Sequence, residues 1–468
     1  MTKCNNFINR YTNLTSLSLF TCGGIGDLGF RASGLNFLAM NELESDRASL
    51  ARLNFPEAIH FEGDIQHIAD DLINAVQAKL HFLKQDLFLV SCTAPCQGMS
   101  SAGMGSILNN VRSGKRRTID PRNRLILPAL KIIQQLKPLW IVFENVLGMR
   151  NTLIEDNDGA IRPILHIIHQ SLSPEYIGSA YPVEFADYGV PQRRQRLITI
   201  YSRISILKKR IDIGTSLIPL PSHSRIKKFK CKPWISVSEA LRDFPKLDSI
   251  SLSKSKSKFI PFHRVPVLDK KKYEWVRNTP PSKSAFDNQC INPKCNYQGN
   301  AVHGTRQGID GINRALYTTP LYCLKCGSLL PRPYAIIQNG HLRIMRGYTS
   351  AYKRMPADLP APTLSRNMSF PCSDQKIHPT ENRVLSLAEA LRLQTIDSYE
   401  YKWGPLRYKN AKGNVINKEI APDTLIRIII AESIPPLFTE LLSRHILKLT
   451  TGDRETNEEQ RQKFLLLQ

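Results

Sequence analysis

The chain has 468 residues, 42% of them hydrophobic, which allows a large core and two lobes, since single cores stop growing near about 250–300 residues. The 64 Lys and Arg residues outnumber the 40 Asp and Glu residues, and the formal charge of +24 favours a polyanionic partner, above all nucleic acid, over a merely solvated basic surface. No run of about 18 apolar residues occurs, so we expect no transmembrane helix, and the polar stretch from Met1 to Arg10 does not resemble a secretory signal.

The cysteine content indicates whether the protein works in a reducing or an oxidising compartment. Ten cysteines in a chain without an expected secretory signal are typical of a reducing environment. Thiols there serve catalysis or metal binding rather than disulfides, so the neighbours of each cysteine decide its role.

The first predicted elements are a strand, a turn and a helix. Ser16 to Phe20 is a short apolar strand, Thr21 to Asp27 is a glycine-rich turn, and a helix starts at Leu28. This order is typical of the entry to a doubly wound α/β sheet, where ligands lie at the carboxyl ends of the strands and glycine lets the backbone approach them. A glycine-rich turn alone is equally compatible with a plain turn.

Acidic residues follow the next two apolar segments. Phe37 to Met40 is a second strand and leads into Asn41 and Glu42. An acid about 20 positions after the glycine turn is placed to accept hydrogen bonds from ribose hydroxyls. Asp64 follows another short apolar segment. Taken singly, each acid is better explained as a solvated loop residue, and only the combination indicates a nucleotide site.

Two later strands end at residues that can do chemistry. Asp86 to Ser91 is an apolar strand that leads to Cys96, and Trp140 to Phe143 is another that ends at Glu144. The apolar segment from Arg124 to Leu136 between them predicts a buried helix. Because the carboxyl ends of neighbouring strands meet in one crevice of a doubly wound fold, we expect Cys96 and Glu144 to lie close together.

A cysteine beside a carboxyl group suits methyl transfer to carbon 5 of cytosine. That carbon is too weakly nucleophilic to take a methyl group directly. A thiolate that adds to C6 turns the ring into an enamine with a reactive C5, and an acid that holds or protonates N3 lowers the barrier. Cys96 is the candidate nucleophile and Glu144 the candidate acid. On composition alone, a free cysteine is more often a small buried hydrophobic residue.

Seven segments, in order, resemble the motifs of bacterial cytosine-C5 DNA methyltransferases of the restriction-modification type. They are Phe20 to Phe30, Asn41-Glu42, Gly63 to Ile65, Pro95 to Ser100, Glu144 to Val146, Asp187 to Arg196, and the stretch from Pro362 to Gln394. The resemblance covers nearly the whole chain, and it is specific because all seven motifs occur in the order that the family has. It implies an α/β fold with a doubly wound, Rossmann-like catalytic lobe, a smaller mixed target-recognition lobe, and DNA (cytosine-5-)-methyltransferase activity.

The resemblance also implies roles for single residues. Cys96 and Glu144 would be catalytic, with Arg194 and Arg196 organising the site around the base. The cofactor would be S-adenosylmethionine, and the residues expected to bind it are Phe20, Thr21, Gly24, Gly26, Glu42, Leu43, Asp64, Ile65 and Ser433. The residues expected to contact DNA are Gln97, Ser100 and Gln192. The basic loop from Gly98 to Asp120 is expected to close over the duplex, a solvated loop being the alternative.

Three positions depart from the family's pattern. Cys22 stands where the first glycine of the cofactor turn is usual, and a positive φ there would weaken cofactor binding. Gln195 replaces a usual Glu inside the arginine motif, which removes one internal ion pair. Glu432 stands in place of the usual Asn of the last motif, which alters the hydrogen bonds of that turn. None of the three replaces the nucleophile.

Residues 205–384 form the predicted target-recognition lobe. The α/β pattern fades from Ile204 onward, and lysines crowd the segment, for example Lys270 to Lys272. Lysines supply phosphate attraction, whereas base reading needs Arg, Asn or Gln at base edges. No code for the DNA site follows from this composition.

Four cysteines of this lobe predict a zinc ribbon at about residues 286–330. Cys290 and Cys295 form one pair, and Cys323 and Cys326 form a second pair after 27 intervening residues. Such pairs in a reducing compartment are typical of a closed, structural four-thiolate site. The wider first spacing leaves His303 as a substitute ligand, and four unrelated thiols are the alternative.

The predicted domain order places the catalytic lobe at residues 1–204, the recognition lobe at 205–384, a hinge at 385–414, and a C-terminal segment at 415–468 that returns to the catalytic lobe. Ser386 to Thr395 predicts a helix with Ser386 and Glu389 as a capping box. Thr424 to Glu432 predicts a helix that packs on the first lobe.

The expected partner is duplex DNA, with one cytosine of a specific sequence flipped out of the stack. The resemblance further implies a bacterial, cytoplasmic, monomeric enzyme, associated with the nucleoid through DNA, and a cognate restriction endonuclease that shares the site without contact. Two alternatives stay open: cytosine-C5 methylation of RNA, as in one branch of the same family, and a non-catalytic nucleic-acid-binding module.

Overall fold

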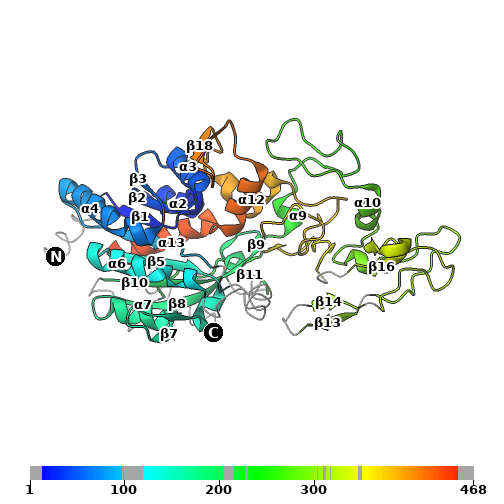
Figure 1. Cartoon of the computed structure of the whole chain (residues 1–468), viewed down its shortest axis with the longest axis horizontal. Helices are drawn as coiled ribbons and strands as arrows, with labels where there is room; N and C mark the ends of the chain where they lie inside the picture. Colours follow the sequence, from blue (N-terminus) through cyan, green and yellow to red (C-terminus); the bar gives the residue numbers. More distant parts are fainter. Residues whose placement is uncertain are drawn as a thin grey trace.

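The computed structural model describes residues 13–96, 98–99, 120–203, 216–226, 230–302, 304–308, 313–316, 318–345 and 350–451. Its elements form two lobes along the long axis of the molecule, an α/β lobe at one end and a lobe of short strands and loops at the other (Figure 1). Within these ranges, no helix combines the length and apolarity needed to cross a bilayer.

A seven-stranded sheet in the order β3-β2-β1-β4-β5-β10-β8 forms the centre of the first lobe. Its strands are β1 (Thr15–Leu19), β2 (Asn36–Glu42), β3 (Ile59–Glu62), β4 (Leu89–Cys92), β5 (Trp140–Asn145), β8 (Ile177–Glu184) and β10 (Gln195–Ser202). The first five strands pair in parallel, and β10 is antiparallel to both of its neighbours. The chain order reverses between β1 and β4, where a doubly wound sheet opens a crevice. The predicted Rossmann-like α/β fold is confirmed, although the strand expected from Asp86 starts only at Leu89.

Helices cover both faces of this sheet, and the central strand β1 is therefore buried at all five residues. One face packs against α4 (Ile65–Leu83), α6 (Ile126–Leu136) and α7 (Ile164–Leu172). The other face packs against α2 (Ile25–Ala32), α3 (Ser45–Asn54) and α13 (Pro436–Thr451). The predicted helix before β5 is α6, preceded by a short helical turn, η3 (Pro121–Leu125).

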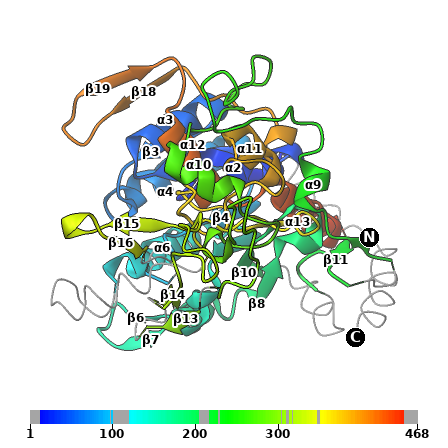
Figure 2. The same cartoon turned by 90° about the vertical axis from the view of Figure 1, so that its right-hand side faces the viewer.

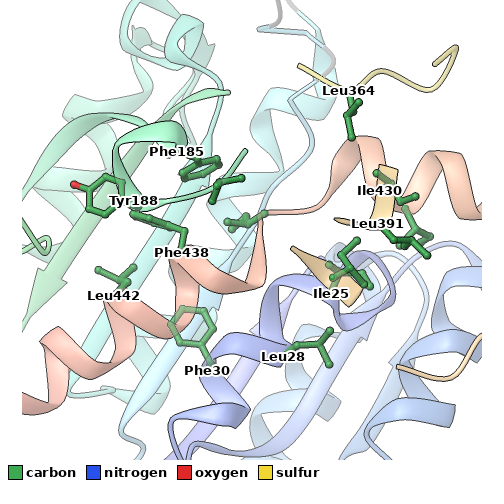
Figure 3. Close-up of a cluster of buried hydrophobic side chains, with 14 of the residues drawn as sticks. Ile25, Leu28, Phe30, Phe185, Tyr188, Leu364, Leu391, Ile430, Phe438 and Leu442 are labelled. Atoms are coloured by element: carbon green, nitrogen blue, oxygen red, sulfur yellow. The ribbon is translucent and has the colours of Figure 1, made fainter. Parts of the chain in front are cut away.

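The C-terminal helix α13 packs directly on α2. Figure 3 shows the apolar cluster at this contact, with Phe30, Phe185, Tyr188, Phe438 and Leu442. A Cβ atom on Gly29 would lie 2.0 Å from the carbonyl oxygen of Pro436, so only glycine lets the two backbones approach this closely. The predicted isoleucine-rich helix is α12 (Asp423–Glu432), which joins the same core. The end of the described chain thus completes the first lobe.

The remaining elements are short. The helices are α9 (Val237–Ala240), α10 (Lys270–Arg277) and α11 (Leu387–Leu393). The strands form two-stranded pairs: β6 (Leu153–Glu155) with β7 (Ile161–Pro163), β9 (Gln192–Arg193) with β17 (Ala361–Pro362), β11 (His223–Ser224) with β12 (Lys232–Pro233), β13 (Thr305–Gln307) with β14 (Asn313–Ala315), β15 (Tyr334–Ile336) with β16 (Leu342–Ile344), and β18 (Leu406–Lys409) with β19 (Val415–Lys418). A small core around Trp275 and Phe286 supports the second lobe.

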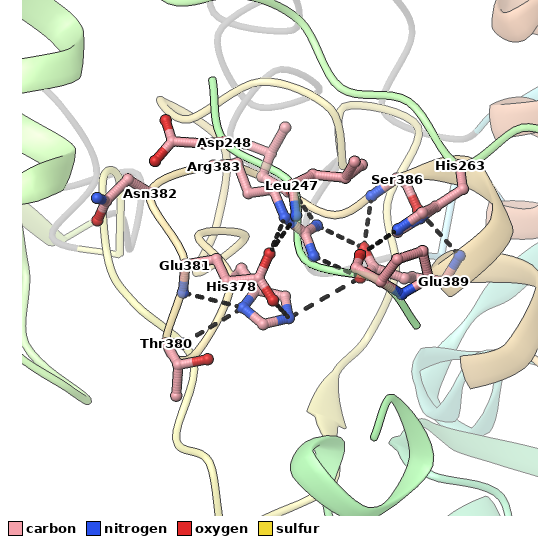
Figure 4. Close-up of polar contacts among 12 residues, drawn as sticks. Leu247, Asp248, His263, His378, Thr380, Glu381, Asn382, Arg383, Ser386 and Glu389 are labelled. Atoms are coloured by element: carbon pink, nitrogen blue, oxygen red, sulfur yellow. Dashed lines mark hydrogen bonds and ion pairs between the residues drawn. The ribbon is translucent and has the colours of Figure 1, made fainter. Parts of the chain in front are cut away.

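A buried cluster of charged side chains precedes α11 (Figure 4). Both hydrogen bonds of the predicted capping box, between Ser386 and Glu389, are present. Arg383 and Glu389 are completely buried and pair at 2.6 Å, and Arg383 Nε lies 2.8 Å from Glu381 Oε2. Glu381 Oε2 also accepts a hydrogen bond from the backbone N–H of Leu247 at 2.8 Å. The cluster therefore fixes α11 to the segment around Leu247.

His378 is the titratable neighbour of this cluster. Its Nδ1 accepts hydrogen bonds from the backbone N–H groups of Thr380 and Glu381, at 3.3 and 3.1 Å, as a neutral ring does. Burial, and then the positive charge of Arg383, lower the pKa of His378 to about 4. The folded chain therefore keeps this ring neutral at a pH where an unfolded chain protonates it.

We expect the free energy of unfolding to fall as the pH drops from about 6.5 towards 4, by up to about 3 kcal/mol from this residue. In that window the unfolded chain binds a proton at His378 and the folded chain does not, so acid favours unfolding; above it, the contribution is fully present. Urea unfolding of the wild type and of His378→Asn between pH 8 and 4.5 measures the loss, because the Asn oxygen keeps the acceptor without titrating. An equal acid loss in both proteins would contradict this assignment.

Candidate active site

The glycine-rich turn after β1 is held by a buried aspartate. Asp27 accepts hydrogen bonds from Ser18 Oγ at 2.8 Å and from Thr21 Oγ1 at 2.6 Å, and this joins the turn to the strand before it. Burial raises the pKa of Asp27 to about 6, against the effect of the two hydroxyl donors. Asp27 was not among the expected site residues, although an acid in the first helical turn after a glycine-rich turn is a signal in the sequence.

The backbone of the turn, η2 (Cys22–Gly24), adopts left-handed conformations. Gly24 has a φ of 82°, and a Cβ atom there would lie 2.5 Å from the Phe55 ring, so this predicted cofactor residue has to be glycine. Cys22 has a φ of 47°, which costs a residue with a side chain about 1–2 kcal/mol. The positive φ considered for Cys22 is therefore present. Gly26 has no such constraint, because its Cβ would make an ordinary 3.5 Å contact with Ile434.

Glu42 and the segment from Gly63 to Ile65, both expected to bind the cofactor, lie where β2 and β3 end. Glu42 Oε2 accepts from the Cys22 N–H at 2.8 Å and Oε1 from the Glu44 N–H at 3.0 Å, and burial raises the pKa of Glu42. Asn41 Nδ2 donates to the carbonyls of Phe61 and Gly63, both at 3.1 Å, which aligns the ends of β2 and β3. The sheet edge therefore brings Glu42 and the residues after Gly63 together.

The neighbours of these acids differ in exposure. Leu43 is 57% exposed, which leaves an apolar side chain open beside Glu42. Asp64 caps α4 by accepting from the Gln66 N–H at 2.9 Å. Ile65, expected to contact the cofactor, is instead 1% exposed and belongs to the core beneath α4.

Two of the three departures from the family's pattern meet in space. Cys22 Sγ lies 4.0 Å from Glu432 Oε2, and Arg47 Nη1 lies 2.8 Å from the same oxygen. The second oxygen of Glu432 pairs with Arg366. A carboxylate at this position is thus neutralised by two guanidinium groups, neither of which the sequence analysis singled out. The third departure, Gln195, is exposed, so no buried ion pair is lost there.

The loop that carries Cys96 is fixed to the end of β5. Asn145 Nδ2 donates to the Ala94 carbonyl at 3.1 Å, and its Oδ1 accepts from the Val146 N–H at 2.9 Å. A Cβ atom on Gly148, in the helical turn η4 (Leu147–Asn151), would lie 2.1 Å from the carbonyl oxygen of Met99. The loop around Cys96 and the end of β5 therefore touch backbone to backbone.

The predicted catalytic residues lie together at this edge. Glu144 is buried, and its Oε1 lies 2.8 Å from Arg196 Nε. Burial raises the pKa of the Cys96 thiol, the charge of Glu144 raises it further, and Arg196 and Arg194 oppose the shift. The structure thus brings Cys96 and Glu144 close enough to the two arginines for their charges to interact.

Arg194 lies deepest in this group, at 1% exposure. Its Nη2 donates to the carbonyls of Ala431 at 2.8 Å and Ser433 at 3.1 Å, which tie it to the turn after α12. Its Nε and Nη1 have no hydrogen-bond partner within the described ranges. Burial, and then the like charge of Arg196, lower the pKa of Arg194 to about 9. Two buried donors are therefore left for a ligand.

The predicted DNA contacts are placed differently. Gln192 is completely buried, where its Nε2 donates to Gln394 Oε1 at 2.5 Å and its Oε1 accepts from the Leu364 N–H at 3.0 Å. A contact with DNA would break these bonds, so we do not include Gln192 in the DNA interface. Gln97, Ser100 and the basic residues of the loop before Asp120 lie outside the described residues. Ser433 is buried and accepts a hydrogen bond from Gln394 Nε2 at 3.2 Å.

The four predicted metal-binding thiols come together in the second lobe. Their Sγ atoms all lie within 4.8 Å of one another, with 3.7 Å between Cys290 and Cys326 and 3.9 Å between Cys295 and Cys323. A zinc ion bonded tetrahedrally to four sulfurs at about 2.3 Å separates them by about 3.8 Å. The donor set and spacing thus fit a four-thiolate zinc site. His303, the substitute ligand, lies outside the described residues.

Comparison with known proteins identifies the family. The model of the C-5 cytosine-specific DNA methylases matches residues 14–423. The chain is 29% identical over 447 residues to the Type II methyltransferase M1.HgaI of Avibacterium volantium, which covers 93% of this chain and 98% of that protein. It is 22% identical over 446 residues to the Type II methyltransferase M.AgeI of Thalassovita gelatinovora, which covers 86% and 96%.

A solved structure shares the fold. The DNA modification methyltransferase encoded within an E. coli prophage aligns with a TM-score of 0.50 at 18% sequence identity, over 93% of this chain and 99% of that one. The sheet order, the grouping of Cys96 with Glu144, and the extent of the family match agree with one another. The chain belongs to the C-5 cytosine-specific DNA methylases and is an S-adenosylmethionine-dependent DNA cytosine-5-methyltransferase.

Proposed function

We propose that methyl transfer proceeds through a covalent bond between Cys96 Sγ and C6 of a cytosine that is flipped out of duplex DNA. The observation that supports this most directly is the grouping of Cys96, Glu144, Arg194 and Arg196 at the carboxyl ends of β4 and β5. Addition of the thiolate to C6 turns the ring into an enamine, whose C5 would form the new bond to the methyl carbon while the sulfur–methyl bond of the sulfonium donor breaks and its electron pair stays on sulfur as a thioether. Loss of the C5 proton to a base then gives its electron pair to the C5–C6 double bond, as the bond from C6 to Cys96 Sγ breaks and the thiolate leaves. A cytosine inside a duplex does not present C6 to the half-buried Cys96 thiol, so it has to leave the stack.

Glu144 and Arg196 act as a unit in this proposal. The guanidinium of Arg196 holds the carboxyl group at 2.8 Å, and this orients its other oxygen towards N3 of the bound base. Arg194 Nε and Nη1, which have no hydrogen-bond partner among the described residues, donate to the base on the other side. The raised pKa of Cys96 keeps the thiol neutral until a substrate arrives. Attack at C6 thus depends on the arginines, which favour the thiolate.

S-adenosylmethionine supplies an electrophilic methyl group when bound, and we propose that it lies along the carboxyl edge of β1 and β2. Gly24 has no side chain, so the cofactor can approach the backbone of the glycine turn closely. The carboxylate of Glu42 has lone pairs left that can accept hydrogen bonds from ribose hydroxyls. The exposed side chain of Leu43 offers the cofactor an apolar contact. Phe20, Thr21, Gly26 and Asp64 border the same edge. Ser433 adjoins the carboxylate of Glu432, which borders the turn.

We propose that the rest of the chain recognises and positions the DNA. Residues 205–384 would form the recognition lobe, with a structural zinc ion. Residues 385–414 would form the hinge, and residues 415–468 would complete the catalytic lobe of residues 1–204. The excess of Lys and Arg over acids attracts the duplex. We propose action as a monomer in the bacterial cytoplasm, on a specific sequence that a cognate restriction endonuclease shares.

Duplex DNA that carries 5-fluorocytosine at random positions tests the covalent step. Fluorine at C5 prevents proton loss, so the wild type should remain bound to DNA on a denaturing gel in the presence of S-adenosylmethionine. Cys96→Ser should give no such band. A band from Cys96→Ser, or trapping on transfer RNA but never on DNA, would exclude the proposed mechanism.

The backbone contact beside Cys96 gives a second prediction. Gly148→Ala should lower the rate of methyl transfer by about 100-fold, because the added Cβ displaces the Met99 backbone and with it the nucleophile. Binding of S-adenosylhomocysteine, measured by calorimetry, should stay within about twofold, since that site lies at β1 and β2. A rate equal to that of the wild type would show that the loop does not need this contact.

The thiol cluster gives a third prediction. The purified wild type should contain about one zinc ion per chain by elemental analysis. Cys323→Ser should lose the metal and lower the thermal midpoint of the second lobe, because a closed site contributes folding energy. Cys372→Ser is the matched control, since Cys372 is an exposed free thiol outside the cluster. Absence of zinc from the wild type, or an equal effect of both variants, would remove the zinc site.

A further inference from the structure

The turn that follows β1 has an unusual backbone. Cys22, Gly23 and Gly24 are three consecutive residues with positive φ, at 47°, 77° and 82°. For Cys22 this region is unfavourable, and such a conformation persists only where surrounding contacts hold it in place. Part of that support is local, since the Gly24 N–H donates to the Thr21 carbonyl at 2.9 Å and the Thr21 N–H donates to the Asn41 carbonyl at 3.0 Å. The carbonyl of Gly23 is held by a distant part of the chain.

Tyr401 supplies that contact. Its hydroxyl donates a hydrogen bond to the Gly23 carbonyl at 2.7 Å. Burial raises the pKa of Tyr401 well above its usual range, so the hydroxyl keeps the proton that it donates. The ring packs edge-on against Trp403, with 4.6 Å between the ring centroids, and this fixes where the hydroxyl lies. The peptide group between Gly23 and Gly24 is therefore held at both of its polar ends, at the carbonyl by Tyr401 and at the N–H within the turn.

The segment 399–403, which we call the strap, is anchored on either side of this bond. The Lys402 N–H donates to Asn54 Oδ1 at 2.7 Å, and Asn54 Nδ2 donates back to the Lys402 carbonyl at 2.9 Å. The Tyr399 hydroxyl donates to Glu440 Oε2 at 2.5 Å, which joins the strap to α13. The strap is thus fixed to both α3 and α13, and it holds its central hydroxyl against the glycine turn.

The chain after the strap holds the neighbouring part of the same lobe. Figures 1 and 2 both show β18 beside α3, the helix that follows β2. Two backbone N–H groups of β18 donate to serine hydroxyls of α3, Arg407 to Ser49 at 3.2 Å and Lys409 to Ser45 at 3.0 Å. The helix α3 starts shortly after Glu42, the acid expected to bind ribose. One continuous stretch of chain therefore holds both the turn after β1 and the helix after β2, and these two elements border the proposed cofactor site.

We propose that Tyr401 is a positioning residue for S-adenosylmethionine, because its bond to Gly23 sets the backbone of the turn before the cofactor arrives. This inference rests on the proposed placement of the cofactor along the edge of β1 and β2. A site that already has its binding conformation loses less free energy to ordering when the ligand binds. Without the hydroxyl, the Gly23 carbonyl loses its donor, and the turn relaxes towards conformations that Cys22 prefers. The cofactor then has to restore the turn, which lowers its affinity, whereas Cys96 follows β4 and the chemical step is unchanged.

Tyr401→Phe tests the proposal, because it keeps the ring and removes only the hydroxyl. The dissociation constant for S-adenosylhomocysteine, measured by calorimetry, should rise by about 10-fold, and the KM for S-adenosylmethionine by a similar factor. The kcat on duplex DNA at saturating S-adenosylmethionine should stay within about twofold, since the lost interaction is made equally before and during the chemical step. Tyr399→Phe is the matched control, because it removes a hydroxyl of the same strap that is bonded to Glu440 of α13 instead of Gly23. Its dissociation constant and KM should stay within about twofold of the wild-type values, whatever its thermal midpoint.

The outcomes separate this inference from the function beneath it. A wild type that binds no S-adenosylhomocysteine at millimolar concentrations would overturn the proposed cofactor site, and the inference with it. A wild type that binds it, with Tyr401→Phe at the same affinity, would overturn only the role of Tyr401. An equal loss of affinity in Tyr399→Phe would show a general loosening of the strap and would also overturn that role. So would a fall in kcat at unchanged KM, because a residue that positions the turn for cofactor binding does not produce it.

Discussion

The buried guanidinium of Arg194 is the constraint around which the catalytic crevice is arranged. A charge at 1% exposure is costly unless hydrogen bonds and opposite charge offset its loss of water. The carbonyls of Ala431 and Ser433 supply those bonds, and Glu144 supplies the opposite charge. The turn after α12 therefore has to lie where it does for Arg194 to be stable. Gln192, two residues before Arg194, donates a hydrogen bond to Gln394, and Gln394 donates to the carbonyl of Ser433 in the same turn. Two neighbouring residues of the chain, Gln192 and Arg194, therefore both hold the turn after α12.

Local patterns in the sequence were enough to predict the elements that position the site. The apolar runs before Asn41, Cys96 and Glu144 predicted the strands, because a covered parallel sheet buries both faces of its strands. The order of motifs predicted the family, and the thiol spacing predicted that four cysteines meet. Each of these features is recognised from short local patterns, or from the order and spacing of such patterns along the chain.

Contacts between distant polar groups could not be predicted in the same way. Cys22 and Glu432 are 410 positions apart, and nothing near either residue indicates the other. The same holds for Arg47 with Glu432, and for Arg332 with two carbonyls on opposite legs of a ribbon. Gln192 shows the converse case: its motif suggested a contact with DNA, whereas in the structure its side chain is buried and bonded to Gln394. Cys22 and Glu432 lie beside each other, and Arg47 and Arg366 balance the charge that Glu432 brings to this place.

The close contact between α2 and α13 has a consequence for how the protein is made. The face of the sheet that α13 covers is complete only when residues from Pro436 onward have been synthesised, yet the strands are finished by Ser202. At about 5–20 residues per second, a nascent chain carries that uncovered apolar face for tens of seconds while the other lobe emerges. An uncovered apolar face of this kind is prone to aggregation. Because only a chain translated through α13 can cover this face, we expect truncated products to lack a closed catalytic lobe and to be open to proteolysis.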